Sequence, residues 1–154
     1  MGQSDWKTEV RNHFENIRIL AKCQAETVTH FEQFCEFIAE SAFEALGDEF
    51  VNFGVKVRTL KARGRDIRLS ICFPGSKEEQ FQYKIVLPKN SVELRLKLII
   101  KARKTVGSAF EVKEEEFMPG LPAGEVMKLP REEVILDILE HYRNFSYEAL
   151  TSPD

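Results

Sequence analysis

The first third of the chain carries a regular stripe of apolar positions. From Ser4 to Leu46 there is neither glycine nor proline, and apolar residues recur at alternating spacings of four and three, interrupted only by Gln24. We predict a helix that buries one face over residues 5–46, with Gly47 as its C-terminal cap. The stripe consists of Val10, Phe14, Ile17, Ala21, Val28, Phe31, Cys35, Ile38, Ala42 and Ala45.

Whether this region is one helix or two is left open by the pattern. A continuous helix of about 42 residues would be roughly 63 Å long, whereas a domain of this size measures only about 35–40 Å across. The unbroken heptad favours one helix, whose excess length would pack most simply on a second copy. Thr29 and Glu32 have capping-box spacing within a β-branched run at 27–29, and this signal together with compactness favours a break or kink there.

The middle of the chain changes to a period of two. Apolar and polar side chains alternate over residues 53–60, 66–73, 81–87 and 94–103, which is typical of strands with one buried face. The separators at 63–65, 74–76 and 88–90 contain glycine, proline or asparagine and read as turns. Connections this short predict an antiparallel meander, because parallel neighbours need long crossovers.

A fifth strand, at about 108–116, is predicted to return beside the fourth. We expect Lys101 opposite Glu111 and Lys97 opposite Glu115, since opposite charges across strands stabilise a sheet by a few tenths to about 1 kcal/mol. A register shifted by one residue would turn apolar side chains of this strand to the wrong face.

These elements predict a single α+β domain over residues 1–154. Its order is a long N-terminal helix or helix pair at 5–46, a four- to five-stranded antiparallel meander sheet within 50–116, a loop at 117–130 and a C-terminal helix at 131–148. The apolar face of the sheet is expected to be covered by one or both helical regions.

Composition adds a strong segregation of charge. The chain has 154 residues, 31% of them charged, and a net charge of −3. The basic residues gather in the middle third, whereas the first and last thirds are acidic, which bears on association and not on fold. No apolar run is long enough to span a bilayer, the start of the chain lacks the apolar core of a secretory signal, and Cys23, Cys35 and Cys72 lack disulfide or zinc spacing. We therefore expect a cytoplasmic protein, with Cys35 in the core.

Alternation places many lysines and arginines on the polar face of the sheet, and we predict that this face binds an acidic protein or nucleic acid. The aromatic side chains that stack on single-stranded bases do not alternate with these cations, because Phe81 and Tyr83 fall on the core side. Glu111 and Glu115 are expected to neutralise part of the face. The predicted binding residues are Lys56, Arg58, Arg68, Lys84, Arg95, Lys97, Lys101 and Arg103.

The helical stripe also predicts self-association, most simply as a homodimer. The residues expected to carry it are Val10, Phe14, Ile17, Phe31 and Ile38. Four glutamates spaced by four, Glu32, Glu36, Glu40 and Glu44, form an acidic ridge on the same helix. Such a ridge is typical of a solvated helix face, and its charge also suits docking against a basic sheet face.

One short pattern resembles a family of enzymes. Asp66 at a strand start, followed by Gln82-Tyr83-Lys84 on the next strand, resembles the acidic residue and (D/E/Q)xK pair of the restriction-endonuclease-like nucleases. The resemblance implies carboxylates that hold magnesium beside a catalytic lysine, here Lys84. If Ser70 faces Lys84, however, Asp66 lies about four residues or 13 Å from that lysine, too far to share a metal.

Other catalytic patterns do not occur in the sequence. It contains no glycine-rich phosphate loop, no HExxH and no GxSxG, and His13, His30 and His141 are expected at the surface or its boundary. We predict a non-catalytic binding or interaction module that needs no metal or cofactor. The alternatives are a small-ligand pocket between sheet and helices, lined by some of the twelve phenylalanines, or a metal-dependent nuclease-like enzyme.

Overall fold

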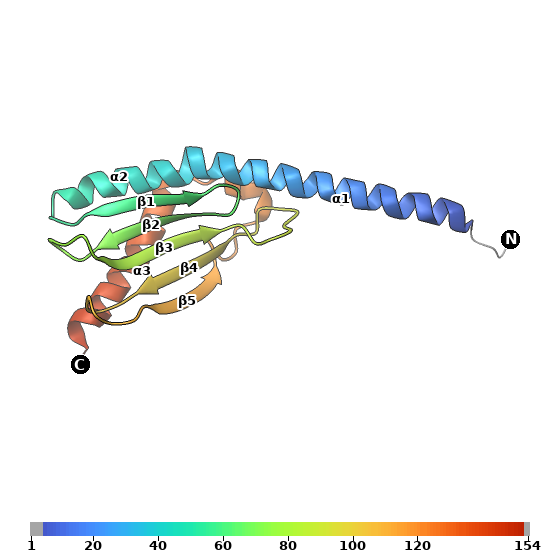
Figure 1. Ribbon diagram of the computed structural model, residues 1–154. Coiled ribbons are helices and arrows are strands. Elements are labelled where there is room, and N and C mark those ends of the chain that lie inside the picture. The colour runs from blue at the N-terminus through green and yellow to red at the C-terminus, as the bar shows by residue number, and fades with distance from the viewer. Residues whose placement is uncertain (1–4, 153–154) are drawn as a thin grey trace.

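The N-terminal region is one continuous helix. In the computed structural model, which describes residues 5–152, α1 (Trp6–Phe34) runs through a π-helical turn (Cys35–Ala39) into α2 (Glu40–Val51). Figure 1 shows it extending well beyond the sheet at its N-terminal end. Asp5 caps the start by accepting hydrogen bonds from the backbone amides of Lys7 and Thr8, which satisfies two of the free donors at a helix N-terminus.

Of the two alternatives that the pattern left open, the structure shows one helix, without a break at 27–29. The hydroxyl of Thr27 donates to the carbonyl of Cys23 at 2.8 Å, and that of Thr29 donates to the carbonyl of Ala25 at 3.2 Å. Both threonines therefore bond back onto the preceding turn of the same helix, and neither caps a new one. Because the helix continues, its length exceeds the width of the sheet and the first part of α1 projects from the domain.

The π-helical turn changes which side chains face the sheet. A π turn contains more residues than an α turn, so it shifts the phase of everything that follows. Beyond it the buried residues are Ala42, Phe43, Leu46 and Gly47, whereas the heptad would have continued with Ala42 and Ala45. The shift brings the large side chains of Phe43 and Leu46 into the core.

Gly47 is not a cap, because α2 continues to Val51. A Cβ atom added at Gly47 would lie 2.5 Å from Cγ2 of Val57, so this glycine lets the first strand approach the helix closely. The chain turns at Gly54, whose φ is 74°, a left-handed conformation that glycine adopts at little cost.

The sheet confirms the predicted meander. Its five strands are hydrogen-bonded in the order β1-β2-β3-β4-β5, and every neighbouring pair is antiparallel. The strands are β1 (Val57–Ala62), β2 (Asp66–Cys72), β3 (Glu79–Val86), β4 (Lys97–Ala102) and β5 (Glu111–Glu116).

The predicted register of β5 is wrong by one residue. Lys101 pairs with Val112 and Lys97 with Glu116, so Val112 faces outward and is 62% exposed. The guanidinium of Arg103 lies 4.5 Å from the ring centroid of Phe110 and donates to the carbonyl of Val106, which stabilises a longer connection than a tight hairpin.

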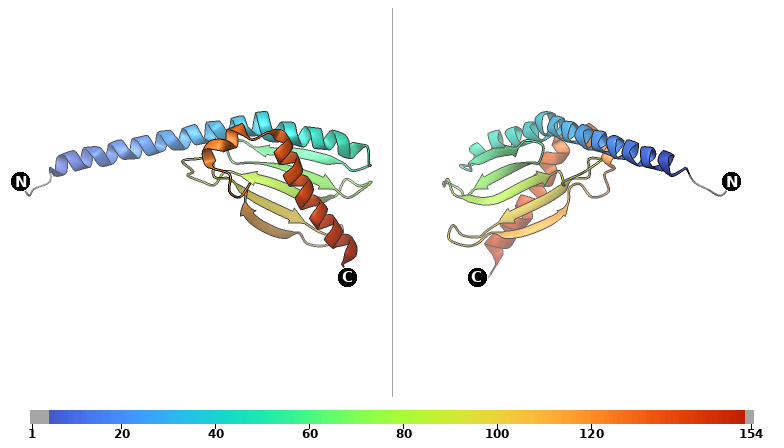
Figure 2. Two further views of the ribbon diagram at one scale, coloured as in Figure 1. Left: turned by 180° about the vertical axis from the view of Figure 1, so that it is seen from behind. Right: turned by 45° about the vertical axis from the view of Figure 1, so that its right-hand side comes forward.

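Helices cover only one face of the sheet. The C-terminal part of the long helix runs along β1, and α3 (Arg131–Thr151) crosses behind the strands, as Figure 2 shows from the rear. The loop at 117–130 contains a 3₁₀ helix, Ala123–Lys128. Among the described residues, no helix combines the length and apolarity that a membrane crossing requires.

The core lies between this inner face and the helices. The ring of Phe43 packs edge-on against Tyr83, with centroids 6.3 Å apart, and Phe34 packs in the same way against Phe117. Cys35 is 1% exposed, and burial raises the pKa of its thiol to about 12, as expected for a small core residue.

The contact between Gly47 and Val57 generates a stability prediction. Gly47→Ala should lower the free energy of unfolding by about 1 kcal/mol net, because overpacking of about 1–3 kcal/mol outweighs the roughly 1 kcal/mol gained in helix propensity. Urea unfolding measures this change. Adding Val57→Ala removes the clash, so the double variant should lose less stability than the sum of the losses in the two single variants. An increase in stability for Gly47→Ala would contradict the close approach.

Candidate functional site

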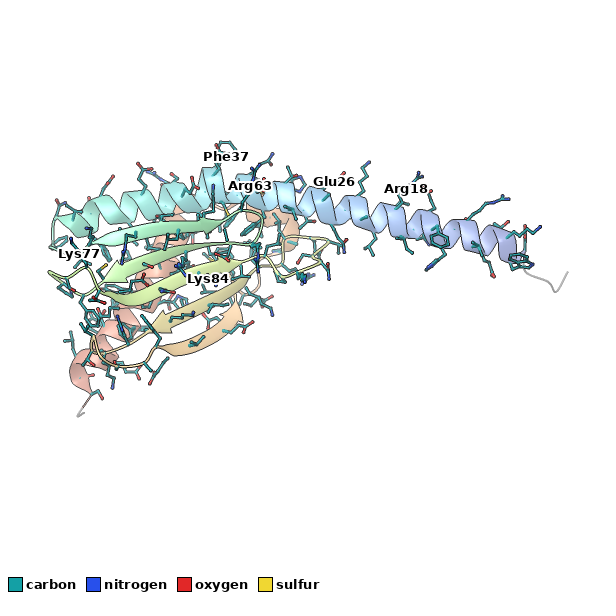
Figure 3. All side chains as sticks on the ribbon, viewed as in Figure 1. Arg18, Glu26, Phe37, Arg63, Lys77 and Lys84 are labelled. Atoms are coloured by element: carbon teal, nitrogen blue, oxygen red, sulfur yellow. The ribbon has the colours of Figure 1, made fainter. Side chains whose placement is uncertain are left out.

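The outer face of the sheet gathers the predicted cations. Arg68 pairs directly with Lys84, and Gln82 with Lys101, so these side chains project to the same side. Figure 3 shows Lys84 in the middle of the sheet, on the face opposite α3. We call this surface the basic face. Of the eight predicted cations, the strand pairing places Arg58, Arg68, Lys84, Lys97 and Lys101 on it, whereas Lys56, Arg95 and Arg103 lie at positions that flank β1 and β4.

Half of these cations lie near a carboxylate. The ion pairs are Arg58 with Glu79 at 3.6 Å, Arg95 with Glu93, Lys97 with Glu114 at 3.1 Å, and Arg103 with Glu78 at 3.7 Å. Within the part of the chain that the structure describes, Lys56, Arg68, Lys84 and Lys101 have no carboxylate oxygen within 4.0 Å.

The expected neutralisation by Glu111 and Glu115 is wrong, because the register of β5 turns both toward the inner side. Glu111 pairs with Ala102, and Glu115 pairs with buried Leu98. Glu114 takes the place expected for Glu115 and contacts Lys97. The centre of the basic face therefore keeps its positive charge.

This cationic centre, formed by Arg68, Lys84 and Lys101, is electrostatically unfavourable by itself. Like charges directly opposite each other on neighbouring strands destabilise a sheet. The same face also holds three buried polar atoms without a hydrogen-bond partner among the described residues: Nε of Arg68, Oγ of Ser70 and Oε1 of Gln82. A buried polar atom without a partner typically costs about 1–3 kcal/mol, and an anionic group near the cationic centre would reduce the repulsion between its cations.

A groove of about 840 Å³ opens at one end of the basic face, where α1 leaves the sheet. Its apolar wall includes Val28 and Leu87, and its rim carries Arg65, Lys84 and Lys89. The groove marks the boundary between the part of α1 that packs on the domain and the part that projects from it.

The nuclease-like pair also lines this groove, but in a different register from the one expected. Asp66 pairs with Val86, and Arg68 rather than Ser70 faces Lys84, which makes Asp66 a diagonal neighbour of Lys84 at about 7–8 Å. No group of three His, Cys, Asp or Glu residues within 5–152 is arranged to hold a metal ion. The described residues do not assemble the carboxylate set that the resemblance implies.

The predicted self-association residues divide into two groups. Val10, Phe14 and Ile17 are 47%, 64% and 46% exposed, whereas Phe31 and Ile38 are 0% and 8% exposed. The first three lie on the projecting part of α1; the other two pack in the domain's own core and are not available to a partner.

Two of the four glutamates of the acidic ridge form ion pairs within the domain. Glu32 contacts Arg63 at 3.2 Å, and Glu40 contacts Lys61 at 2.7 Å, so two of the four glutamates hold the long helix against β1. Figure 3 shows Arg63 beneath the helix at this edge of the sheet. Glu36 and Glu44 are exposed.

A polar network on the inner face was not predicted. The phenol of Tyr83 donates to the carboxylate of Asp137 at 2.5 Å, and Nε2 of His141 lies 2.6 Å from the carboxylate of Glu115. His141 Nδ1 also lies 2.8 Å from the carbonyl of Asp137. The i, i+4 spacing of Asp137 and His141 was visible in the sequence, but the shifted register that brings Glu115 to them was not.

This environment changes two pKa values. Burial, followed by the Asp137 carboxylate, raises the pKa of Tyr83 well above its usual range, so the phenol stays a donor. Burial by itself would lower the pKa of His141, but its hydrogen bonds with the Asp137 carbonyl and the Glu115 carboxylate outweigh burial and raise that pKa. The network therefore joins α3 to β3 and β5 through His141, and its contacts favour the protonated form of the imidazole.

Comparison of the chain with protein-family models, with curated proteins and with solved structures finds no match.

The His141 contacts generate a prediction about pH. Because the pKa of His141 is raised in the folded state, its contribution to stability is present below the unfolded value of about 6.5 and is lost as pH rises through the folded pKa. Urea unfolding between pH 5.5 and 8.5 should show this loss in the parent and a flatter profile in His141→Gln. His13→Gln, on the exposed part of α1, is the control and should keep the parent profile; an unchanged profile in His141→Gln would refute the assignment.

Proposed function

We propose that this chain is a non-catalytic binding module that self-associates through the projecting part of α1 and offers the basic face to an acidic partner. The observation that carries the proposal is the cationic centre of Arg68, Lys84 and Lys101 on the uncovered side of the sheet. The proposal includes a cytoplasmic location, which the three free cysteines support.

Charge complementarity supports an acidic partner. The carboxylates of a partner would separate the like charges of Arg68 and Lys84 and would supply acceptors for their N–H groups. Binding of this kind is screened by salt, because the cations of the face lie near solvent.

The partner that fits best is an acidic protein surface rather than nucleic acid. The outward positions of β2, β3 and β4 carry no aromatic side chain, so the cationic centre offers bases no ring to stack on. Glu114 and Glu116 border the face along β5 and would repel an extended phosphate backbone. A compact acidic patch can instead contact the cationic centre and avoid this edge.

The projecting helix supports self-association. Residues 5–22 of the helix are all exposed, a length of about 27 Å, and an isolated helix of this size is only marginally stable in water. Trp6 and Phe14 are two-thirds exposed on it. Exposed apolar groups gathered on one helix face are typical of an interaction surface.

The basic face is tested with a fluorescent hexaglutamate peptide and a single-stranded oligonucleotide of equal charge, measured by anisotropy at several salt concentrations. Lys84→Glu with Lys101→Glu should weaken peptide binding at least about tenfold, because removing two attractions and adding two repulsions costs more than about 1.4 kcal/mol. The parent should prefer the peptide and lose affinity as salt rises.

Lys113 offers a matched control for this measurement. It is exposed on β5 and pairs with Ile100, whose side chain faces the core, so Lys113→Glu changes the charge on the opposite side of the sheet. It should change binding less than about threefold. Equal weakening by Lys113→Glu and Lys84→Glu would show that net charge acts rather than this face, and tighter binding of the oligonucleotide would favour nucleic acid.

Self-association is tested by sedimentation equilibrium. Ile17→Asp should convert dimers to monomers, because it places a charge on the apolar stripe. Ile19→Asp is the control: the two isoleucines are 46% and 52% exposed, but two helical residues are about 200° apart, so Ile19 lies on the other side. A parent that stays monomeric at high concentration, or equal dissociation by both variants, would contradict the proposal.

A further inference from the structure

The projecting stripe and the core-facing stripe are one surface. Val10, Phe14 and Ile17 are exposed, while Phe31 and Cys35, at the next positions of the same spacing, are buried against the sheet. Between them, the side chain of Val28 lies beside Gly64 in the turn before β2. The domain's own sheet therefore begins on this helix face at about residue 28 and covers it from there to the end of α2.

This arrangement limits how two copies can pair. In a parallel pair with two-fold symmetry, the axis runs along the helices, so each residue lies beside the same residue of the other copy. Each helix would then continue past residue 28 along the face of the other, into the space that the other copy's sheet occupies next to Phe31 and Leu46. A parallel pair through the stripe is therefore blocked by the fold itself.

An antiparallel pair avoids this obstacle. The partner helix would begin beside the groove and run away from the sheet, so the two domains lie at opposite ends. Knobs-into-holes packing between antiparallel heptads sets alternate positions against each other. The register that uses the projecting stripe best packs Phe14 of one copy on Ile17 of the other and Val10 on Ala21, with the two-fold axis between residues 15 and 16.

The groove fits the end of the second helix. In this register Trp6 of the second copy lies beside Ala25, which lines the groove. The first turn carries Asp5, Lys7 and Glu9. It would approach a groove lined by Arg65, Lys84 and Lys89 together with Asp66 and Glu114. In a parallel pair the same acidic turns would face each other instead.

The surface removed from water is sufficient for a specific contact. Aromatic side chains bury about 150–250 Å² each, and Trp6 and Phe14 are 66% and 64% exposed, so these two alone could remove roughly 200–320 Å² per copy. With Val10, Ile17 and Leu20 from both helices, complete burial of these side chains would remove roughly 1,000 Å², about the minimum for a specific interface.

We propose that two copies of this chain pair through residues 6–25 of α1 as an antiparallel two-helix coil, in which Trp6 of each copy enters the groove of the other. This proposal rests on the self-association proposed above and specifies its partner and direction. It covers the groove end of each basic face, where Lys84 and Lys97 line the groove, and leaves the rest of both faces open at opposite ends of an elongated dimer.

Disulfide trapping tests the direction. In a Cys23→Ser background, Val10→Cys with Ala21→Cys should form a covalent dimer on mild oxidation, because the two positions face each other across an antiparallel pair. Val10→Cys alone and Ala21→Cys alone should form no more covalent dimer than Ile19→Cys. In the antiparallel register two copies of position 10 are about 16 Å apart along the axis, far beyond the Cα separation of a disulfide.

The outcomes separate this inference from the proposed function. Efficient cross-linking of both single variants, Val10→Cys and Ala21→Cys, would establish a parallel pair and overturn the direction, while self-association would stand. A non-covalent dimer in sedimentation, with no cross-link in the Val10→Cys, Ala21→Cys variant, would overturn this register. A monomer in sedimentation would remove both proposals. In the expected dimer, Trp6→Ala should weaken association at least about fivefold in sedimentation equilibrium.

Discussion

Burial of the aliphatic and aromatic side chains of β2, β3 and β4 beneath the helices is the constraint on which the rest of the structure depends. Because side chains alternate along a strand, committing Leu69, Tyr83 and Ile100 to the core sends Arg68, Lys84 and Lys101 to the other side. The cations of the cationic centre are thus gathered on one surface by the hydrophobic effect, even though they repel each other. No ion pair is needed to place them there.

The long helix connects this core to the projecting surface. Its apolar stripe is longer than the part of the helix that the sheet covers. The stripe residues from Phe31 to Ala42 are buried, and those before Val28 are exposed. The π-helical turn at Cys35–Ala39 adjusts the phase so that Phe43 and Leu46 face the core. The same sheet that stabilises the second half of the helix also limits which partner can reach the first half, which links the fold to the mode of association.

Charge has two different roles on the two faces. On the inner side and at the β1 edge, Glu32, Glu40 and Glu115 contact Arg63, Lys61 and His141, so acidic groups are used to hold helices to the sheet. On the outer side the cationic centre keeps its charge. The acidic first and last thirds of the chain therefore contact internal partners in part, while the cationic centre has no carboxylate partner within the described residues.

Local pattern was sufficient for the order and type of the elements: period two between residues 53 and 103 specified a half-buried antiparallel sheet, and the heptad specified a helix with one apolar face. Separation of the basic residues from the core followed from the same alternation. Register and helix continuity were decided only by the tertiary structure. The hydroxyls of Thr27 and Thr29 can cap a new helix or bond back to the old one, and only the packed sheet beyond them makes continuation favourable. Similarly, a shift of one residue in β5 sets Val112 in solvent and Glu115 against His141, because contacts with α3, distant in sequence, outweigh the cross-strand charge pairs from which the other register was predicted.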